Sequence, residues 1–161
     1  MKIANMDAQR TVTLFADGAC IPNPGPGGWA FRLQINNIAA EMFGSETEST
    51  NLRMELMAVV SGLRHLKKSC HVVLVSDSDY VCDGLTRWLS KWKQHEWKTS
   101  AGDPVKNLDL WMELDRLVTT HRVKARHPES PREFLLNVRV DELANRAAVA
   151  KASNHLTYLN E

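Results

Sequence analysis

Alternating apolar and polar positions predict that the chain opens with three β-strands. Val12–Ala16 alternates and is rich in β-branched and aromatic residues, which is typical of a strand. The run NPGPGG follows Asp17 after a few residues. Because proline fixes φ and glycine admits positive φ, this run predicts a tight reversal into a second strand over Trp29–Ile35. A third apolar segment, Ile38–Phe43, extends the expected antiparallel sheet.

The middle of the chain changes to a helical period. Apolar residues recur three and four positions apart from Leu52 to Leu66, after a polar loop with good N-cap candidates. His71–Ser76 is apolar on both faces, which predicts a central strand covered on each side. Two further amphipathic helices are expected over Asp79–Trp92 and Leu108–Val118.

The last third is harder to interpret. RVKAR suits a short strand, HPESPRE a proline-broken loop, and FLLNVRV either a strand or the lead-in to a helix. DELANRAAVAKAS predicts a helix headed by Asp141. The order of elements predicts an α/β fold with a mixed sheet in a single domain over residues 1–161, with residues 1–9 and 156–161 as frayed ends.

Composition narrows the class of protein. A chain of 161 residues with a net charge of +1 suits one domain, and any basic patch must be local. The three cysteines have no metal-ligand spacing, which favours free thiols in a reducing compartment. We find no signal-peptide pattern and no apolar run that would span a bilayer. We therefore expect a cytoplasmic monomer with no membrane association.

Several carboxylates stand in costly places. Asp17 ends the first predicted strand, Asp77 follows the central strand, and Glu55 lies on or beside the apolar stripe of the helix between them. Asp17 and Glu55 have ordinary alternatives, as a turn residue and as a glutamate that reaches solvent. Asp141, at the head of the last predicted helix, has one as an N-cap. If the first and fourth strands are neighbours, the first three acids converge and repel one another without a cation. Oxygen ligands favour Mg²⁺ or Mn²⁺, and two such ions suit phosphodiester displacement.

A basic segment follows the central strand and its helix. Between Arg87 and Lys106 cations outnumber acids and three tryptophans are interleaved with them. This pattern suits a nucleic-acid backbone, but tryptophans at helical spacing more often pack in a core, and we expect at least two of the three to do so. The candidate contacts here are Trp88, Lys91, Trp92, Lys93, Trp97 and Lys98.

Five blocks resemble the successive signatures of type 1 ribonuclease H, in the order and spacing of that family. They are DGACIPNPGPGGWAF, TNLRMELMAVVSGL, VSDSDYV, KWKQHEWKTSAGDPVKNLDLW and VDELANRAA. The resemblance implies a ribonuclease H-like fold, with a five-stranded mixed sheet flanked by helices. It also implies metal-dependent cleavage of the RNA strand of RNA–DNA hybrids, leaving 3′-hydroxyl and 5′-phosphate ends.

The same resemblance assigns roles to residues. It places the catalytic, metal-binding acids at Asp17, Glu55, Asp77 and Asp141, holding two Mg²⁺ ions, or Mn²⁺ as substitute, when substrate is bound. It implies hybrid contacts at Asn23, Thr50, Asn51, Lys106 and Asn107, with the basic segment gripping the DNA strand. Contacts to 2′-hydroxyls on one strand and phosphates on the other would explain hybrid selectivity without base reading.

The sequence also departs from the family. The family places WVKGHAGH before the last helix, and Pro131 stands where its histidine belongs. His127 lies four residues earlier, and a catalytic role for it is not expected unless the loop is re-routed. Leu52 replaces a second asparagine, and Asp79 replaces a glutamine and adds negative charge near the substrate. The alternative function is therefore a hybrid-binding module with reduced or lost catalysis. A resolvase or integrase type of nuclease is a weaker third hypothesis, against which the basic segment and the NPGPGG turn both speak.

Overall fold

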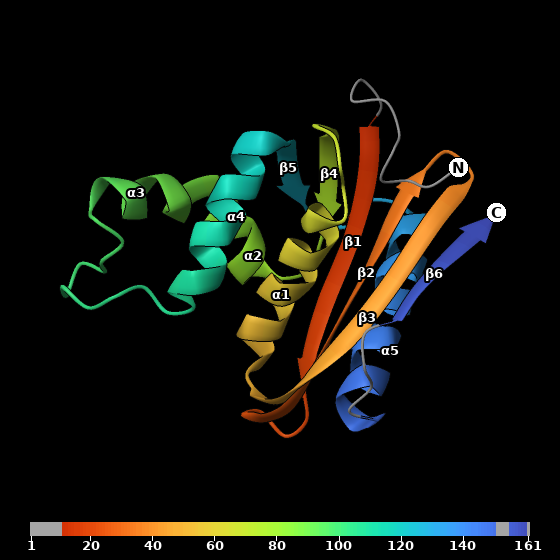
Figure 1. Cartoon of the computed structure of the whole chain (residues 1–161), viewed down its shortest axis with the longest axis horizontal. Coiled ribbons are helices and arrows are strands. Elements are labelled where there is room, and N and C mark those ends of the chain that lie inside the picture. The colour runs from red at the N-terminus through yellow and green to blue at the C-terminus, as the bar shows by residue number, and fades with distance from the viewer. Residues whose placement is uncertain (1–10, 151–154, 161) are drawn as a thin grey trace.

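One mixed sheet organises the described residues, 11–150 and 155–160, of the computed structural model (Figure 1). Its strands are β1 (Thr11–Cys20), β2 (Gly25–Ile35), β3 (Ile38–Ser49), β4 (His71–Val75), β5 (Arg122–Arg126) and β6 (His155–Asn160). The helices are α1 (Asn51–Arg64), α2 (Asp79–Asp83), α3 (Leu89–Gln94), α4 (Leu108–Thr120) and α5 (Pro131–Ala150), and a π-helical segment, Gly84–Trp88, joins α2 to α3.

The sheet has the strand order β5-β4-β1-β2-β3-β6. β4 is parallel to both β1 and β5, and every other pair is antiparallel. The predicted mixed sheet is therefore confirmed, and β1 and β4 are neighbours, which is the condition under which the acids were expected to converge. The sheet has six strands instead of five, because β6 pairs with β3 and covers an edge that would otherwise be open.

That sixth strand corrects the expectation for the C-terminus. We expected residues 156–161 to be frayed, but residues 155–160 form β6. The segment HLTYLN finds its backbone partners along β3, from Ile38 to Phe43. Residues 1–9, the other expected frayed end, lie outside the described part of the chain.

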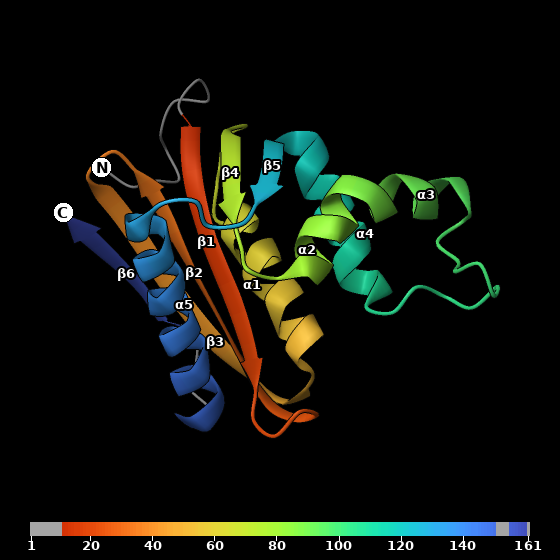
Figure 2. The same cartoon turned by 180° about the vertical axis from the view of Figure 1, so that it is seen from behind.

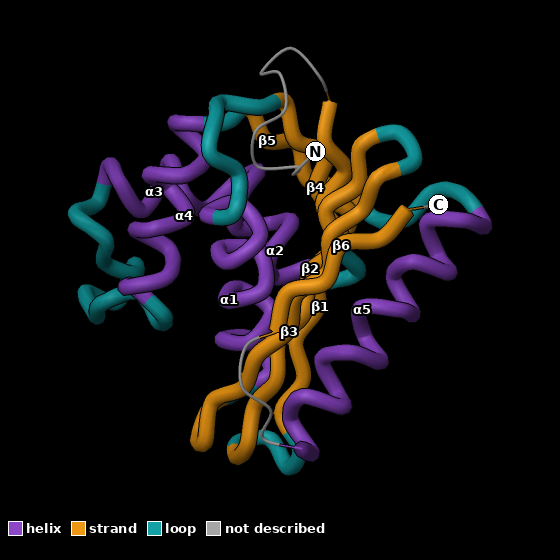
Figure 3. The backbone as a smooth tube through the Cα atoms, turned by 45° about the vertical axis from the view of Figure 1, so that its right-hand side comes forward, coloured by secondary structure: helices purple, strands orange, loops and turns teal. Residues whose placement is uncertain are grey.

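Helices cover the two faces of the sheet, with α1, α2 and α4 on one side and α5 on the other (Figure 3). Successive side chains of β1 point to opposite faces, so Leu14 joins the larger core with Phe31 and Leu63, whereas Phe15 packs in a smaller core with Val140. Figure 2 shows α5 lying along the face formed by β1, β2 and β3.

Two glycines let the helices approach the sheet closely. A Cβ on Gly18 would overlap with the backbone at Glu55, and a Cβ on Gly28 would overlap with the backbone at Ala144. The glycines of the opening hairpin therefore do more than turn the chain. They let α1 carry Glu55, and α5 carry Asp141, down against β1 and β2.

Several predicted boundaries are wrong. β2 begins at Gly25, inside the NPGPGG run, and β3 continues to Ser49, through most of the expected polar loop. β1 continues through Asp17 to Cys20, so Asp17 lies inside a strand and is not a turn residue. α5 begins at Pro131, so Asp141 lies in mid-helix and its N-cap interpretation fails. Proline suits the first helical position because its missing N–H has no partner there in any case, and Ser130 accepts a hydrogen bond from the Glu133 N–H at 3.2 Å. The segment FLLNVRV is therefore helical.

Candidate active site

Four carboxylates converge from four elements, and we call them the carboxylate site. Asp17 lies in β1, Glu55 in α1, Asp77 two residues after β4, and Asp141 in α5. Their charges act on one another: burial, followed by Asp77, Asp141 and Glu55, raises the pKa of Asp17 to about 8, although the Gly18 hydrogen bond opposes this. The parallel pairing of β1 with β4 brings Asp17 and Asp77 together, and the helices packed on the two faces of the sheet add Glu55 and Asp141.

Asp17 is the deepest member of the site. It is 6% exposed, and its Oδ1 accepts a hydrogen bond from the Gly18 N–H at 2.8 Å. One backbone donor does not compensate a carboxylate buried beside other carboxylates. Asp17 therefore remains protonated at neutral pH or requires a cation.

Glu55 is oriented by a serine that the sequence interpretation missed. The Ser78 hydroxyl donates to Glu55 Oε2 at 2.6 Å and also accepts from the Val81 N–H at 3.2 Å as the N-cap of α2. Burial is the largest influence on Glu55 and raises its pKa, and the charge of Asp77 adds to the rise. The available signal was the serine directly before a predicted helix start at Asp79.

Two asparagines on α5 contact the exposed members of the site. Asn137 Nδ2 donates to Asp77 Oδ2 at 3.3 Å, and Asn145 Nδ2 donates to Asp141 Oδ1 at 3.2 Å. Asn137 was also missed, because its segment was not recognised as part of the last helix. The sequence did contain an indication of its role, because Asn137 is a polar residue at a position that falls on the apolar face of that helix.

The donor set is made of oxygens, which suits a hard divalent cation. Among the residues that the structure describes, no group of three or more His, Cys, Asp or Glu side chains is arranged to hold a metal ion. The metal assignment therefore remains a prediction. The fit of the residues is favourable, because burial and like charges disfavour the ionised form of Asp17, and a buried amide oxygen beside the acids, Asn137 Oδ1, has no hydrogen-bond partner within the described chain.

The predicted hybrid contacts near α1 lie together. Asn23, in the turn between β1 and β2, accepts a hydrogen bond at Oδ1 from the Asn51 N–H at 3.2 Å. Thr50 is the N-cap of α1 and accepts from the Arg53 N–H at 3.2 Å. The hydrogen bond between Asn23 and Asn51 joins the turn to the start of the helix that carries Glu55.

The other predicted phosphate contacts lie where α4 begins. Asn107 has a φ of 56° and Lys106 is exposed. Asn107 Nδ2 donates to Tyr80 Oη at 3.3 Å, and the same hydroxyl accepts from Trp111 Nε1 at 2.9 Å. The start of α4 is therefore tied to α2, close in sequence to Asp77.

The basic segment projects from the body of the protein at α3 and the loop after it (Figure 1). Trp92 and Trp97 pack against the main core, which confirms that at least two of the three tryptophans serve packing, and the Trp88 ring lies 5.8 Å from that of Trp92. Lys91 and Lys98 line a hollow of about 800 Å³, to which Trp92 also contributes. Lys93 differs, because its Nζ lies 3.3 Å from Asp115 Oδ1.

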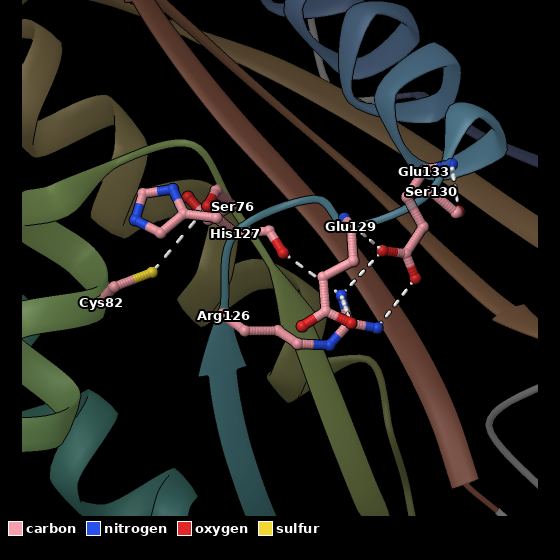
Figure 4. A network of polar contacts seen from close by, with 7 residues as sticks. All are labelled: Ser76, Cys82, Arg126, His127, Glu129, Ser130 and Glu133. Atoms are coloured by element: carbon pink, nitrogen blue, oxygen red, sulfur yellow. Dashed lines mark hydrogen bonds and ion pairs between the residues drawn. The ribbon is translucent and has the colours of Figure 1, made fainter.

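The loop between β5 and α5 is held by an ion pair (Figure 4). Arg126 reaches Glu133 through two contacts of 2.7 and 2.8 Å, and Glu133 also accepts from the Glu129 N–H at 2.9 Å. His127 Nε2 lies 3.1 Å from Asp79 Oδ1, with both side chains largely in solvent. His127 thus contacts the start of α2, and Pro131 is the first residue of α5.

A helix-flanked mixed sheet on which acids from two parallel strands and two helices converge defines an α/β protein with a site suited to phosphate-ester chemistry. The family model described as RNase H matches residues 9–149. The chain belongs to the ribonuclease H family, and it has the ribonuclease H-like fold that the resemblance implied.

Relatives agree with this assignment. The chain is 47% identical over 136 residues to a ribonuclease H of Pseudomonas entomophila, covering 84% of this chain and 92% of that one. It is 47% identical over 139 residues to ribonuclease HI of Neisseria meningitidis, covering 86% and 96%. Among solved structures, LC9-RNase H1, described as a type 1 RNase H with the type 2 active-site motif, matches with a TM-score of 0.80 at 28% identity, over 98% of this chain and 80% of that one. Within the described ranges, no helix is long and apolar enough to cross a membrane.

Proposed function

We propose that this chain is an endoribonuclease that hydrolyses the RNA strand of RNA–DNA hybrids and leaves 3′-hydroxyl and 5′-phosphate ends. Membership of the ribonuclease H family supports the reaction class. The observation that carries the proposal is the convergence of Asp17, Glu55, Asp77 and Asp141, expressed in the raised pKa of Asp17. A purely structural sheet gains nothing from mutually repelling carboxylates.

The proposed cofactor is Mg²⁺, with Mn²⁺ as substitute and two ions per site when the hybrid is bound. Asp17, Glu55, Asp77 and Asp141 would hold them. Such ions, when bound, supply an activated water and stabilise the leaving oxygen in phosphodiester hydrolysis.

The protein's own contribution is to orient these acids before the substrate arrives. Each carboxylate accepts a hydrogen bond, and the donors are the Gly18 N–H, Ser78, Asn137 and Asn145. Three of the acids stand on regular secondary structure and the fourth closely follows β4, so their relative positions are fixed by the sheet and the packed helices. Preorganisation of this kind lowers the cost of assembling the reactive geometry.

The proposed substrate surface runs from the β1–β2 turn to the basic segment. Asn23 and Asn51 would contact the hybrid near the cleaved strand, and Thr50, Lys106 and Asn107 would hold a phosphate. The exposed Lys91 and Lys98, with the half-buried Trp92 beside them, would meet the DNA strand. Phosphate contacts of this kind position the duplex without reading its sequence.

A cleavage assay on an end-labelled RNA–DNA hybrid, with Mg²⁺ and Mn²⁺ compared, tests the proposal. We expect cleavage of the RNA strand alone. Binding of the hybrid without cleavage in either metal would support the hybrid-binding module instead, and cleavage of duplex DNA would contradict the ribonuclease assignment. We further propose that the chain is a single-domain cytoplasmic monomer. Size-exclusion chromatography tests its oligomeric state.

A further inference from the structure

A buried amide interrupts the apolar face of α5. Val140, Leu143 and Ala144 are buried against the sheet, and Asn137 lies on the same side of the helix with only 8% of its surface exposed. Asparagine is mostly exposed in proteins, and a buried one normally has its polar atoms paired. Its partners therefore reveal what the position is for.

Only half of this amide is paired among the described residues. Nδ2 donates to Asp77 Oδ2 at 3.3 Å, whereas Oδ1 is buried and accepts no hydrogen bond. The orientation follows from chemistry, because an ionised carboxylate accepts hydrogen bonds and the reversed amide would place two acceptor oxygens together. A buried acceptor without a donor is unfavourable, so we expect the donor to come from outside the chain.

The amide borders the carboxylate site on two sides. It contacts Asp77 directly. Asp141 is four residues further along α5, and residues four apart lie on the same helix face. The Asn137 side chain therefore lies beside Asp77 and on the helix face that carries Asp141.

Ion pairs attach α5 to the rest of the protein on both sides of Asn137, so loose packing of the helix does not explain the unpaired Oδ1. Before Asn137, Glu133 is gripped by both guanidinium nitrogens of Arg126. After it, Arg139 donates to both carboxylate oxygens of the buried Glu41, at 3.3 and 3.0 Å. Ion pairs on either side restrain the rotation of the helix, which keeps position 137 facing the sheet.

We propose that Asn137 is a positioning residue of the carboxylate site: Nδ2 holds Asp77, and Oδ1 accepts a hydrogen bond from a water molecule in the hydration shell of the bound divalent cation. The inference rests on the proposed function. Mg²⁺ retains several of its waters in proteins, and these are strong donors. Loss of such an outer partner typically costs about 10–100-fold in metal affinity or activity.

The test compares Asn137→Leu with Leu143→Ala, a buried neighbour on the same helix face that has no polar atom. For Asn137→Leu we expect the Mg²⁺ concentration that half-saturates the thermal shift of the substrate-free protein to rise about 10–100-fold, with kcat lower by a similar factor. KM for the hybrid should not change, and the metal-free Tm should be equal or higher, because an unpaired buried oxygen is removed. Leu143→Ala should show the reverse pattern, with a lower Tm and an unchanged Mg²⁺ requirement.

Two results would overturn the inference. One is Asn137→Leu with wild-type Mg²⁺ half-saturation and kcat in a protein that cleaves hybrids, which would leave the proposed function intact. The other is a lowered Tm as the only change, which would make Asn137 a packing residue. Asn137→Ala removes the amide without adding bulk and replaces the leucine variant if that fails to fold. If the wild-type protein cleaves no hybrid, the proposed function fails, while the substrate-free Mg²⁺ titration still tests Asn137.

Discussion

α5 contributes carboxylates to two different surroundings: Glu133 to an ion pair, and Asp141 to the carboxylate site. At its start Arg126 and Glu133 satisfy each other, and the hydrogen bonds from Arg126 lower the pKa of Glu133 to about 2. Further along, Asp141 joins Asp17 in the carboxylate site, where burial and like charges raise the pKa of Asp17 to about 8. A carboxylate is stabilised as an anion in one place and destabilised in the other.

This comparison distinguishes charges that are paired within the protein, and stabilise the fold, from charges that have no cationic partner there and are available to bind a ligand. Arg139 and Arg32 both reach the buried Glu41, at 3.0 Å each, so that group is balanced inside the protein. Asp17, in the carboxylate site, has a backbone hydrogen-bond donor, and the charges that act on it are those of other acids. Balanced groups should matter for stability, and unbalanced ones for activity.

The largest expected effect is loss of cleavage on removing one unbalanced charge. Asp77→Asn should abolish Mg²⁺-dependent hydrolysis and leave the fold intact, because the site loses a ligand and also some repulsion. Asp83→Asn is the matched control, since Asp83 pairs with Arg87 at 2.9 Å on the exposed side of a helix. Single-turnover cleavage and circular dichroism check the result. An Asp77→Asn protein that cleaves at the wild-type rate would contradict the metal assignment.

A second expected effect divides the lysines of the basic segment. Lys91 and Lys98 are exposed in the hollow beside Trp92, whereas Lys93 already lies near Asp115. Neutralising Lys91 and Lys98 together should raise KM for the hybrid much more than it lowers kcat, because these charges would bind DNA phosphates away from the reacting bond. The log–log salt slope should fall by up to about 0.9 for each phosphate that the variant no longer neutralises.

Lys93→Gln provides the comparison for that experiment. Its charge is partly balanced by Asp115 at the surface, so its effect on KM and on the salt slope should be smaller than that of the double variant. An unchanged salt slope in the double variant would mean that the hollow is an ordinary solvated surface and that the hybrid binds elsewhere.

A third prediction contrasts the pH dependence of stability without metal. The folded pKa of Asp17, about 8, lies above its ordinary 3.8, so the folded state binds the extra proton. Its contribution is therefore fully present below about pH 4 and is lost as the pH rises towards 8. Asp17→Asn should melt at a higher temperature than wild type near pH 8, and at a similar one near pH 4, in EDTA. Equal melting temperatures at both pH values would contradict it.

Glu133 should behave in the opposite sense. Its folded pKa, about 2, lies below its ordinary 4.5, so its contribution is present above pH 4.5 and is lost as the pH falls through 2. Glu133→Ala should cost about 1 kcal/mol at neutral pH, since the pair is partly solvated and the helix also loses a capping interaction. Urea denaturation at pH 7 and pH 2 checks this. A loss that persists at pH 2 would show that the charge is not the cause.

Periodicity alone predicted the elements that carry three of the four acids. Where α5 was misjudged, the helix-start signal was present: Ser130, Pro131 and Glu133 form the pattern of a capped helix with proline at its first position. We interpreted the prolines as breakers because HPESPRE contains two of them. Because of that error Asn137 was not identified as a candidate. It is recognised as a polar residue on the buried face only when FLLNVRV and DELANRAA are placed on one helix.

Other features could not be predicted from local pattern. The extension of β1 past Asp17 depends on its pairing with β2, where Asp17 lies opposite Ala30 and Cys20 opposite Gly27. The hydrogen bond from Ser78 to Glu55 joins residues 23 positions apart in the chain. Such contacts are set by the packing of α1 and α2, and no spacing rule within one element contains them.

The smallest expected effect concerns His127. The resemblance to the family implies a loop histidine that assists the reaction, and Pro131, which begins α5, stands at its position. His127 contacts the exposed Asp79 in a loop that the Arg126–Glu133 pair holds in place. Proton transfer by a positioned group contributes about 10²–10⁴-fold, so an enzyme without it should be slower but still active.

His127→Ala distinguishes a surface histidine from one that takes part in catalysis. We expect kcat to fall by less than about threefold, well below the range of acid–base assistance. Asp79→Asn is the companion variant: it removes the ion-pair partner of His127 and a negative charge near the hybrid, so it should lower KM slightly through weaker repulsion. A loss of kcat in the acid–base range for His127→Ala would mean that this loop moves when the hybrid binds and that His127 then reaches the reacting phosphate.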